Sequence, residues 1–295
     1  MKLMDIGERK TIDRIWEVIG GKNEDEDVHF IDSGDYYTLL AIDTLNEGIH
    51  FKRDWDPYTI GKFLVDVNLS DIASKNGRPH EFMASMSFPR TLDLDYVEGI
   101  AEGIRAECGK YEMKFSGGDM KESGLISLTG LVIGGIQKGK EFRRVGARPG
   151  DFVYITNKVG KQEKAMKEFY SGSGIPEDII TIEPRFDVLG KMNEHKITSC
   201  LDNSDGIYKS LELLARINGV GITIKENVCL ERDEKFRKFC YTFGGDYELI
   251  FTSPEKIDGF PLIGTVDDGT GVIDLDGFPL STKGYDHFSV DIVNF

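Results

Sequence analysis

The chain has 295 residues, of which 40% are hydrophobic and 29% are charged. This length favours two domains, since a domain usually holds about 100–200 residues, and the composition excludes both disorder and collagen-like repetition. The formal net charge is −15, from 36 basic and 51 acidic side chains. We therefore expect no general binding to nucleic acid or to anionic membranes, and a bound phosphate would need metal ions or local amides to offset repulsion.

Cysteine usage and apolar runs indicate the compartment. The four cysteines are Cys108, Cys200, Cys229 and Cys240, which stand far apart without a C-x-x-C pair. We expect reduced thiols rather than a disulfide framework or a zinc site. The N-terminus lacks the apolar core of a signal peptide, and the most apolar stretch, residues 125–136, is too short to cross a bilayer. These features predict a cytoplasmic protein.

The first half of the chain predicts a mixture of helices and strands. Apolar residues at helical spacing predict a helix over the first 20 residues, which Gly20 and Gly21 end. After it we expect strands at 28–32 and 36–42 around a hairpin turn, a helix at 58–76, a strand at 82–88, a helix at 94–111, a glycine-containing loop at 116–119 and a strand at 125–136.

The clearest predicted break in secondary structure is the segment 146–151, which holds two glycines and a proline. We place a domain boundary there and expect one domain at 1–145 and a second at 146–295. In the second half the patterns predict helices at 161–170, 185–193 and 207–218, and strands at 152–156, 221–224, 249–252, 262–266 and 272–274. Strands and helices mixed in both halves indicate an α/β or α+β fold.

Aspartates stand at the ends of predicted elements, most of them beside Gly, Ser or Asn. They are Asp27, Asp43, Asp71, Asp119, Asp202, Asp205 and Asp246. Aspartate often caps helices and forms turns, which is the more common reason for any one position. Mg²⁺, however, takes oxygen ligands and shares its site with substrate phosphates. Because Asp202 and Asp205 crowd negative charge without a neighbouring Lys or Arg, the set favours a metal site.

Glycine pairs and an arginine pair are the other candidates for phosphate binding. Gly117-Gly118 and Gly244-Gly245 expose backbone amides that could approach a phosphate, although a tight turn is the ordinary reason for such a pair. Arg143-Arg144 is either a phosphate clamp or solvated charge. The chain has neither a Walker loop nor a G-x-G-x-x-G motif after a strand, so neither of those nucleotide-binding folds is expected.

The order of these motifs resembles one enzyme family. The matching segments are 41–51, 67–73, 77–79, 116–119, 144–151, 201–206, 244–249 and 283–288. Together they resemble thiamine-monophosphate kinases, in the superfamily of aminoimidazole ribonucleotide synthetase. The resemblance covers essentially the whole chain, and segments 43–51 and 283–288 are its most specific parts.

The resemblance implies a two-domain fold whose N-terminal domain binds ATP and metal and forms a homodimer through its sheet, with an α/β C-terminal domain. It implies transfer of a phosphoryl group from ATP to thiamine monophosphate, assisted by several Mg²⁺ ions. The implied metal ligands are Asp27, Asp43, Asp71, Asp119, Asp202 and Asp205, with Asp71, Asp119 and Asp205 catalytic through the metal. The implied ATP contacts are Gly118, Asp119, Arg144 and Ser204, and the implied acceptor contacts are His50, Tyr285 and Asp246.

This chain also departs from the family pattern. It has Asp25-Glu26-Asp27 in place of Gly-Asp-Asp, Ala41-Ile42 in place of Ser-Thr, and Gly245 in place of a Glu. Two alternatives therefore stay open at this point. One is a divergent relative that uses ATP to activate another small acceptor, and the other is a paralogue that binds nucleotide without turnover.

Overall fold

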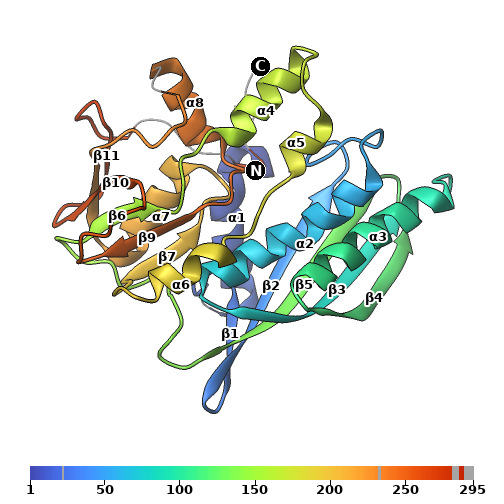
Figure 1. Ribbon diagram of the computed structural model, residues 1–295, viewed down its shortest axis with the longest axis horizontal. Coiled ribbons are helices and arrows are strands. Elements are labelled where there is room, and N and C mark those ends of the chain that lie inside the picture. The colour runs from blue at the N-terminus through green and yellow to red at the C-terminus, as the bar shows by residue number, and fades with distance from the viewer. Residues whose placement is uncertain (22, 232–233, 281–285, 289–295) are drawn as a thin grey trace.

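The structure, a computed structural model, describes residues 1–21, 23–231, 234–280 and 286–288. These residues form two sheets (Figure 1), with strand orders β1-β2-β5-β3-β4 and β11-β8-β10-β6-β9-β7. Every strand of the first sheet comes before residue 145 and every strand of the second comes after it. Mixed sheets with helices packed on them agree with the predicted fold class.

The first sheet consists of β1 (His29–Ser33), β2 (Tyr36–Asn46), β3 (Arg78–Phe88), β4 (Lys114–Glu122) and β5 (Ser127–Gln137). β1 and β2 form an antiparallel hairpin that turns at Gly34, whose φ of 80° favours glycine. β5 pairs antiparallel with both β2 and β3, while β4 runs parallel to β3 at the edge. The parallel pair needs a crossover, which α3 (Leu94–Lys110) supplies.

Two helices, α2 (Pro57–Ser74) and α3, cover one face of this sheet (Figure 1). The Asp56 carboxylate caps α2 by accepting the Thr59 amide at 2.9 Å. Glycines let the two helices approach closely, because a Cβ on Gly61 would lie 2.1 Å from the Ile100 carbonyl oxygen and one on Gly103 would lie 2.0 Å from that of Tyr58. α2 is thus fixed against both the sheet and its neighbour, and this fixes the polar residues at its C-terminal end.

The second sheet consists of β6 (Phe152–Ile155), β7 (Ser199–Asp202), β8 (Gly221–Ile224), β9 (Leu249–Ser253), β10 (Leu262–Asp267) and β11 (Gly271–Ile273). The helices of this half are α4 (Lys161–Tyr170), α5 (Pro176–Ile180), the 3₁₀ turn η1 (Phe186–Val188), α6 (Leu189–Met192), α7 (Ile207–Asn218) and α8 (Glu234–Phe243). Of these, α5 packs on α2, and its Ile180 belongs to the core of the first sheet. β7 is one of the two edge strands and pairs with β9, so Asp202 ends a strand at the border of the sheet.

The N-terminal helix α1 (Leu3–Ile19) has no buried residue and is held by polar contacts. It kinks at Gly7, and the Asp286 carboxylate accepts the Glu8 amide just after the kink, at 3.1 and 3.2 Å. The Arg9 guanidinium forms an ion pair with Asp25. α1 ends at Gly20 in the left-handed conformation, as the sequence predicts.

Several predicted elements coincide with the observed ones, and others need correction. α4, α7 and β8 have the predicted bounds, whereas β7, α5 and α8 were not predicted. The expected helix at 185–193 is a 3₁₀ turn followed by a four-residue helix. Segment 116–119 is part of strand β4 rather than a loop. Gly118 serves close strand pairing there, because a Cβ would lie 1.7 Å from the Ala84 carbonyl oxygen.

The cysteine prediction is wrong for one pair. Cys229 and Cys240 form a disulfide, whereas Cys108 and Cys200 are buried free thiols. Cys240 lies in α8, an element that the sequence reading missed, and both cysteines belong to the same buried cluster as Phe236. Among the described residues, no helix combines the length and the apolar character needed to span a membrane.

Candidate metal centre

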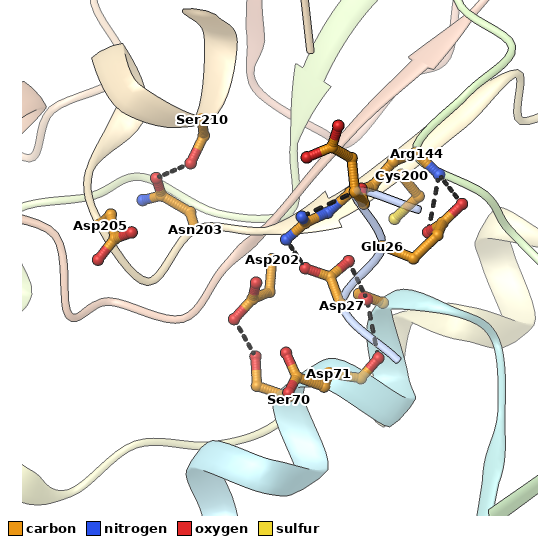
Figure 2. A network of polar contacts seen from close by, with 12 residues as sticks. Glu26, Asp27, Ser70, Asp71, Arg144, Cys200, Asp202, Asn203, Asp205 and Ser210 are labelled. Carbon is orange, nitrogen blue, oxygen red and sulfur yellow. Dashed lines mark hydrogen bonds and ion pairs between the residues drawn. The ribbon is translucent and has the colours of Figure 1, made fainter. Parts of the chain in front are cut away.

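Three carboxylates from distant parts of the chain meet at one point. Asp27 precedes β1, Asp71 lies near the C-terminal end of α2, and Asp202 ends β7. One oxygen atom of each lies within 4.8 Å of those of the other two (Figure 2). Carboxylate oxygens at this spacing are the donors that a hard divalent cation such as Mg²⁺ takes.

Polar groups on α2 orient the carboxylates that come from other elements. The Ser70 hydroxyl donates to Asp202 Oδ2 at 3.2 Å, and the Ser74 hydroxyl donates to Asp27 Oδ2 at 3.1 Å. The buried Asn68 side chain accepts the Asp43 amide at 3.0 Å, which ties β2 to α2. Because Ser70 and Ser74 lie one turn apart on the same face of the helix, α2 holds Asp202 and Asp27 together.

Two basic side chains neutralise one side of the cluster formed by the three carboxylates. The Arg144 guanidinium pairs with Asp27 Oδ1, and the Arg144 amide donates to Glu26 Oε1 at 3.2 Å. The Lys75 ammonium lies 2.5 Å from Asp27 Oδ2 and 2.9 Å from Glu26 Oε2. Both oxygens of Asp27 are therefore in ion pairs, and Arg144 contacts protein carboxylates in this state.

Burial and mutual repulsion disfavour ionised carboxylates on the other side. Burial, with repulsion from Asp43 and Asp202, raises the pKa of Asp71 well above its usual value. Burial raises the pKa of Asp43 to about 7, with a contribution from Asp205. Burial also raises the pKa of Asp202 to about 6, although Arg144 opposes this shift. A divalent cation would relieve this repulsion, so the residues present fit Mg²⁺.

Asp205 and Ser204 lie close to this group but outside it. Figure 2 shows Asp205 set apart from Asp27, Asp71 and Asp202, which turn toward one another. The Asp205 carboxylate pairs with Lys209 at 2.6 Å, one turn along α7. The expectation that Asp205 has no basic neighbour is thus corrected, because the helix brings a residue four positions away alongside it. The Ser204 carbonyl oxygen accepts the Gly245 amide at 2.8 Å.

Gly118 and Asp119 do not lie near the cluster of Asp27, Asp71 and Asp202 in the same chain. Both lie in β4, at the edge of the first sheet and far from β7 (Figure 1). The Asp119 carboxylate is 57% exposed and pairs with Lys121 at 2.7 Å. Register pairs Asp119 with Ser85, whose side chain lies on the sheet face that α2 and α3 leave uncovered.

His50 lies after β2 and contacts the returning C-terminal segment. Its Nδ1 accepts the Asn46 amide at 2.9 Å, so the neutral ring carries its proton on Nε2. The ring centre lies 5.5 Å from that of His287. Burial, with His287 beside it, lowers the pKa of His50 to about 4. Tyr285 lies outside the described residues.

Asp246 caps a helix in this structure. Its carboxylate accepts the backbone amides at the start of α4, at 2.8 to 3.2 Å, from Gly160, Lys161 and Gln162. Beside it is a polar cavity of about 180 Å³, lined in part by Arg185 and Glu248, which pair at 2.6 Å. Gly245 adjoins this region, because a Cβ there would lie 3.5 Å from Gln162.

Sequence reasoning assigned no role to Lys75, Glu26 or Tyr247. Tyr247 has a φ of 51°, which is rare for a non-glycine residue and is typical of strained functional positions. Burial raises the pKa of its hydroxyl well above the usual value, and the acidic residues Asp43 and Asp202 add to the shift. The signal for Lys75 was its position four residues after Asp71, on the same helical face.

Residues 24–136 match the family model described as AIR synthase related protein, N-terminal domain. A thiamine-monophosphate kinase of Aquifex aeolicus is 30% identical, over 98% of this chain and all of the relative. The chain belongs to the thiamine-monophosphate kinase family. A family member from Pyrococcus horikoshii is 30% identical over 84% of each chain. A solved structure described as AaThiL complexed with AMPPCP and TMP has a TM-score of 0.88 at 27% identity, and covers 97% of this chain and 99% of that chain.

Membership of the thiamine-monophosphate kinase family extends through both halves of the chain. The family model covers only the part that carries Asp27, Asp43, Asp71 and Asp119, whereas the full-length relatives also cover Asp202. The fold that brings Asp27, Asp71 and Asp202 together is therefore shared, over 97% of this chain, with the solved structure described as AaThiL.

Proposed function

We propose that this chain transfers the terminal phosphoryl group of ATP to thiamine monophosphate, giving thiamine diphosphate. The observation that carries the proposal is the meeting of Asp27, Asp71 and Asp202 in a chain of this family. The relatives are thiamine-monophosphate kinases, and the similar solved structure holds an ATP analogue and TMP. Phosphoryl transfer depends mainly on positioning and charge neutralisation, for which such a group is suited.

Asp27, Asp71 and Asp202 would hold Mg²⁺, with Asp43 and Asp205 as further ligands. Bound Mg²⁺ supplies positive charge between two phosphate-bearing reactants that otherwise repel each other. Arg144 would leave Asp27 and contact the polyphosphate of ATP, where a guanidinium can donate two hydrogen bonds. Ser204 would contact ATP from the loop before α7, and Ser70 and Ser74 would keep the carboxylates oriented when metal enters.

The uncovered face of the first sheet supports a homodimer. Leu40, Ile42, Leu131 and Ile133 lie on this face, and the Ile42 side chain is 66% exposed. We propose that residues 1–145 form the domain that binds ATP and metal and dimerises through this face, and that 146–295 form the second domain. Gly118 and Asp119 would then reach the site of the other subunit, since they do not reach the site of their own.

We propose His50 and Tyr285 as acceptor contacts, with the cavity beside Asp246 as part of the same subsite. His50 can donate from Nε2 because Nδ1 already accepts the Asn46 amide. Gly245 leaves room beside Gln162 at the position where the family has a Glu. This difference favours one alternative, namely a divergent enzyme of the same fold that phosphorylates another small acceptor.

The test is incubation of the protein with ATP, Mg²⁺ and thiamine monophosphate, followed by chromatography of the products. We expect thiamine diphosphate and ADP in equal amounts, and no thiamine product when Mg²⁺ is removed with EDTA. ATP turnover that requires a different phosphorylated acceptor would favour the divergent enzyme. Nucleotide binding by calorimetry without any product would favour a non-catalytic paralogue.

A further inference from the structure

Lys75 is a buried cation whose role is not explained by packing. It follows the last residue of α2, and its side chain is 0% exposed. The ammonium contacts Asp27 Oδ2 at 2.5 Å, Glu26 Oε2 at 2.9 Å and the Cys200 carbonyl oxygen at 3.1 Å. An ammonium has three donors, so each has an acceptor from a different residue. Burying a lysine is costly unless such partners exist.

We propose that Lys75 is a built-in cation that takes the place of a metal ion on the Glu26–Asp27 side of the centre. The divalent cation is then confined to the side formed by Asp71 and Asp202, with Asp27 shared between the two sides. This inference rests on the proposed metal site, but it does not depend on which molecule accepts the phosphoryl group.

The charges around the centre support this assignment. Glu26, Asp27, Asp71 and Asp202 carry four negative charges when ionised, and Lys75 and Arg144 supply two positive charges. The charge left without a basic partner lies on the Asp71 and Asp202 side, where Asp43 and Asp205 add to it, so divalent cations are drawn to that side. Without Lys75, Glu26 and Asp27 would lose the cation that both of them contact, and a second metal ion would be needed there.

Lys75 also differs from Arg144 in what it can do. Arg144 contacts Asp27 from the segment before residue 145 and is 17% exposed, so it can turn toward a bound anion. Lys75 is anchored by the end of α2 and by the β7 carbonyl oxygen of Cys200, with no exposed surface. It is therefore a positioning residue that stays with the carboxylates throughout a reaction cycle.

The test counts divalent cations in the full-length protein without nucleotide. Free Mn²⁺ is measured by electron paramagnetic resonance during titration of the wild type and of Lys75→Met. We expect Lys75→Met to bind one more Mn²⁺ per chain than the wild type. Lys110→Met is the matched control, because Lys110 also pairs with a buried carboxylate, Glu107 at 2.7 Å, and its count should equal that of the wild type.

Thermal unfolding separates this role from a purely structural one. We expect Lys75→Met to unfold at a lower temperature than the wild type in EDTA, and Mg²⁺ to restore most of the difference. A purely structural loss would lower the unfolding temperature equally with and without Mg²⁺. In Glu26→Gln/Lys75→Met the surplus carboxylate is absent, so the Mn²⁺ count should return to the wild-type value.

Equal Mn²⁺ counts in Lys75→Met and the wild type would overturn the proposal, as would a deficit in stability that Mg²⁺ leaves unchanged. If Lys75→Met fails to fold even with Mg²⁺, the double variant Glu26→Gln/Lys75→Met decides. A double variant that also fails to fold, or that binds more Mn²⁺ than the wild type, contradicts the proposal. A wild type that binds no Mn²⁺ would instead contradict the proposed metal site. Absence of thiamine diphosphate would contradict the proposed function alone.

Discussion

Asp71 is a buried carboxylate whose ionised form costs stability, a cost that a bound cation would reduce. It is buried on α2, and its pKa is raised well above the usual value by burial and by Asp43 and Asp202. In the same region Asp27 is already neutralised by Lys75 and Arg144. The metal-free protein thus pairs the carboxylates on one side of the centre with basic side chains and leaves those on the other side repelling one another, a repulsion that a divalent cation would reduce.

Asp71→Asn should separate stability from activity. We expect the turnover number to fall at least about 100-fold, because even residues one step beyond metal ligands typically contribute 10–100-fold. In EDTA at pH 8 the variant should unfold at a higher temperature than the wild type, since a repelling charge is gone. Calorimetry and a product assay measure the two effects. Asp54→Asn, at an exposed position, is the control, and a lower unfolding temperature in EDTA for Asp71→Asn would contradict the account.

The stabilising effect of Mg²⁺ should grow with pH. The pKa of Asp43 rises from 3.8 to about 7 on folding, so between these two pH values the folded state binds more protons than the unfolded state. The metal-free protein therefore loses stability as pH rises toward 7, and Mg²⁺ must displace those protons when it binds at low pH. We expect a larger Mg²⁺-dependent increase in unfolding temperature at pH 8 than at pH 5.5. An equal or smaller increase at pH 8 would refute this.

At the scale of elements, sequence patterns predicted most helices and strands but not how polar residues are used inside them. The periodicity of 161–170 and 207–218 predicted α4 and α7, because apolar residues there face one core. Gly117 and Gly118 suggested a loop, whereas both lie in an edge strand, and at Gly118 the backbone of β3 comes too close for a side chain. Such a close approach is set by a partner strand some 30 residues away, so local sequence does not reveal it.

The candidate site was predictable in its residue types but not in its assembly. The carboxylates at element ends and the family motifs identified Asp27, Asp71 and Asp202, and the structure brings them together. The exposed position of Asp119 and the capping role of Asp246 depend on sheet order and on where α4 begins. Neither is encoded in the few residues around each aspartate.

Asp66 provides a test of the packing between α2 and α3. It is 3% exposed, and its Oδ1 is buried without a hydrogen-bond partner among the residues described. Burial and the nearby Glu107 raise its pKa well above 3.8, so folding favours the protonated carboxyl. The free energy of unfolding therefore decreases as the pH rises. Asp66→Asn should stabilise the protein at pH 8 by about 1 kcal/mol, and less at pH 5. Urea unfolding measures the change in the free energy of unfolding. Asp95→Asn, at an exposed position, is the control. A less stable Asp66→Asn protein at pH 8 would contradict the prediction.

At the scale of the molecule, the proposed active site needs two copies of the chain. Asp71 and Asp202 belong to one group, whereas Asp119 lies on the uncovered side of the first sheet. A symmetric dimer through this face would combine Asp71 of one subunit with Asp119 of the other. Each active site would then need Asp71 from one subunit and Asp119 from the other.

Mixing two inactive variants tests this arrangement. Asp71→Asn and Asp119→Asn, refolded together, should regain about a quarter of wild-type activity, because half of the dimers then hold one intact site of two. Asp71→Asn mixed with Asp202→Asn should regain none, since both residues belong to the same group. Recovery in neither mixture, with dimers present in both, would contradict the shared site.

The most direct test of the central claim is a crystal structure with Mn²⁺, AMPPCP and thiamine monophosphate, using anomalous scattering to locate the metal. We expect an anomalous peak in contact with Asp71 and Asp202, with Lys75 still on Glu26 and Asp27 and with the phosphates of both ligands facing the metal. Manganese bound elsewhere, with Asp27, Asp71 and Asp202 unchanged and distant from both ligands, would contradict it.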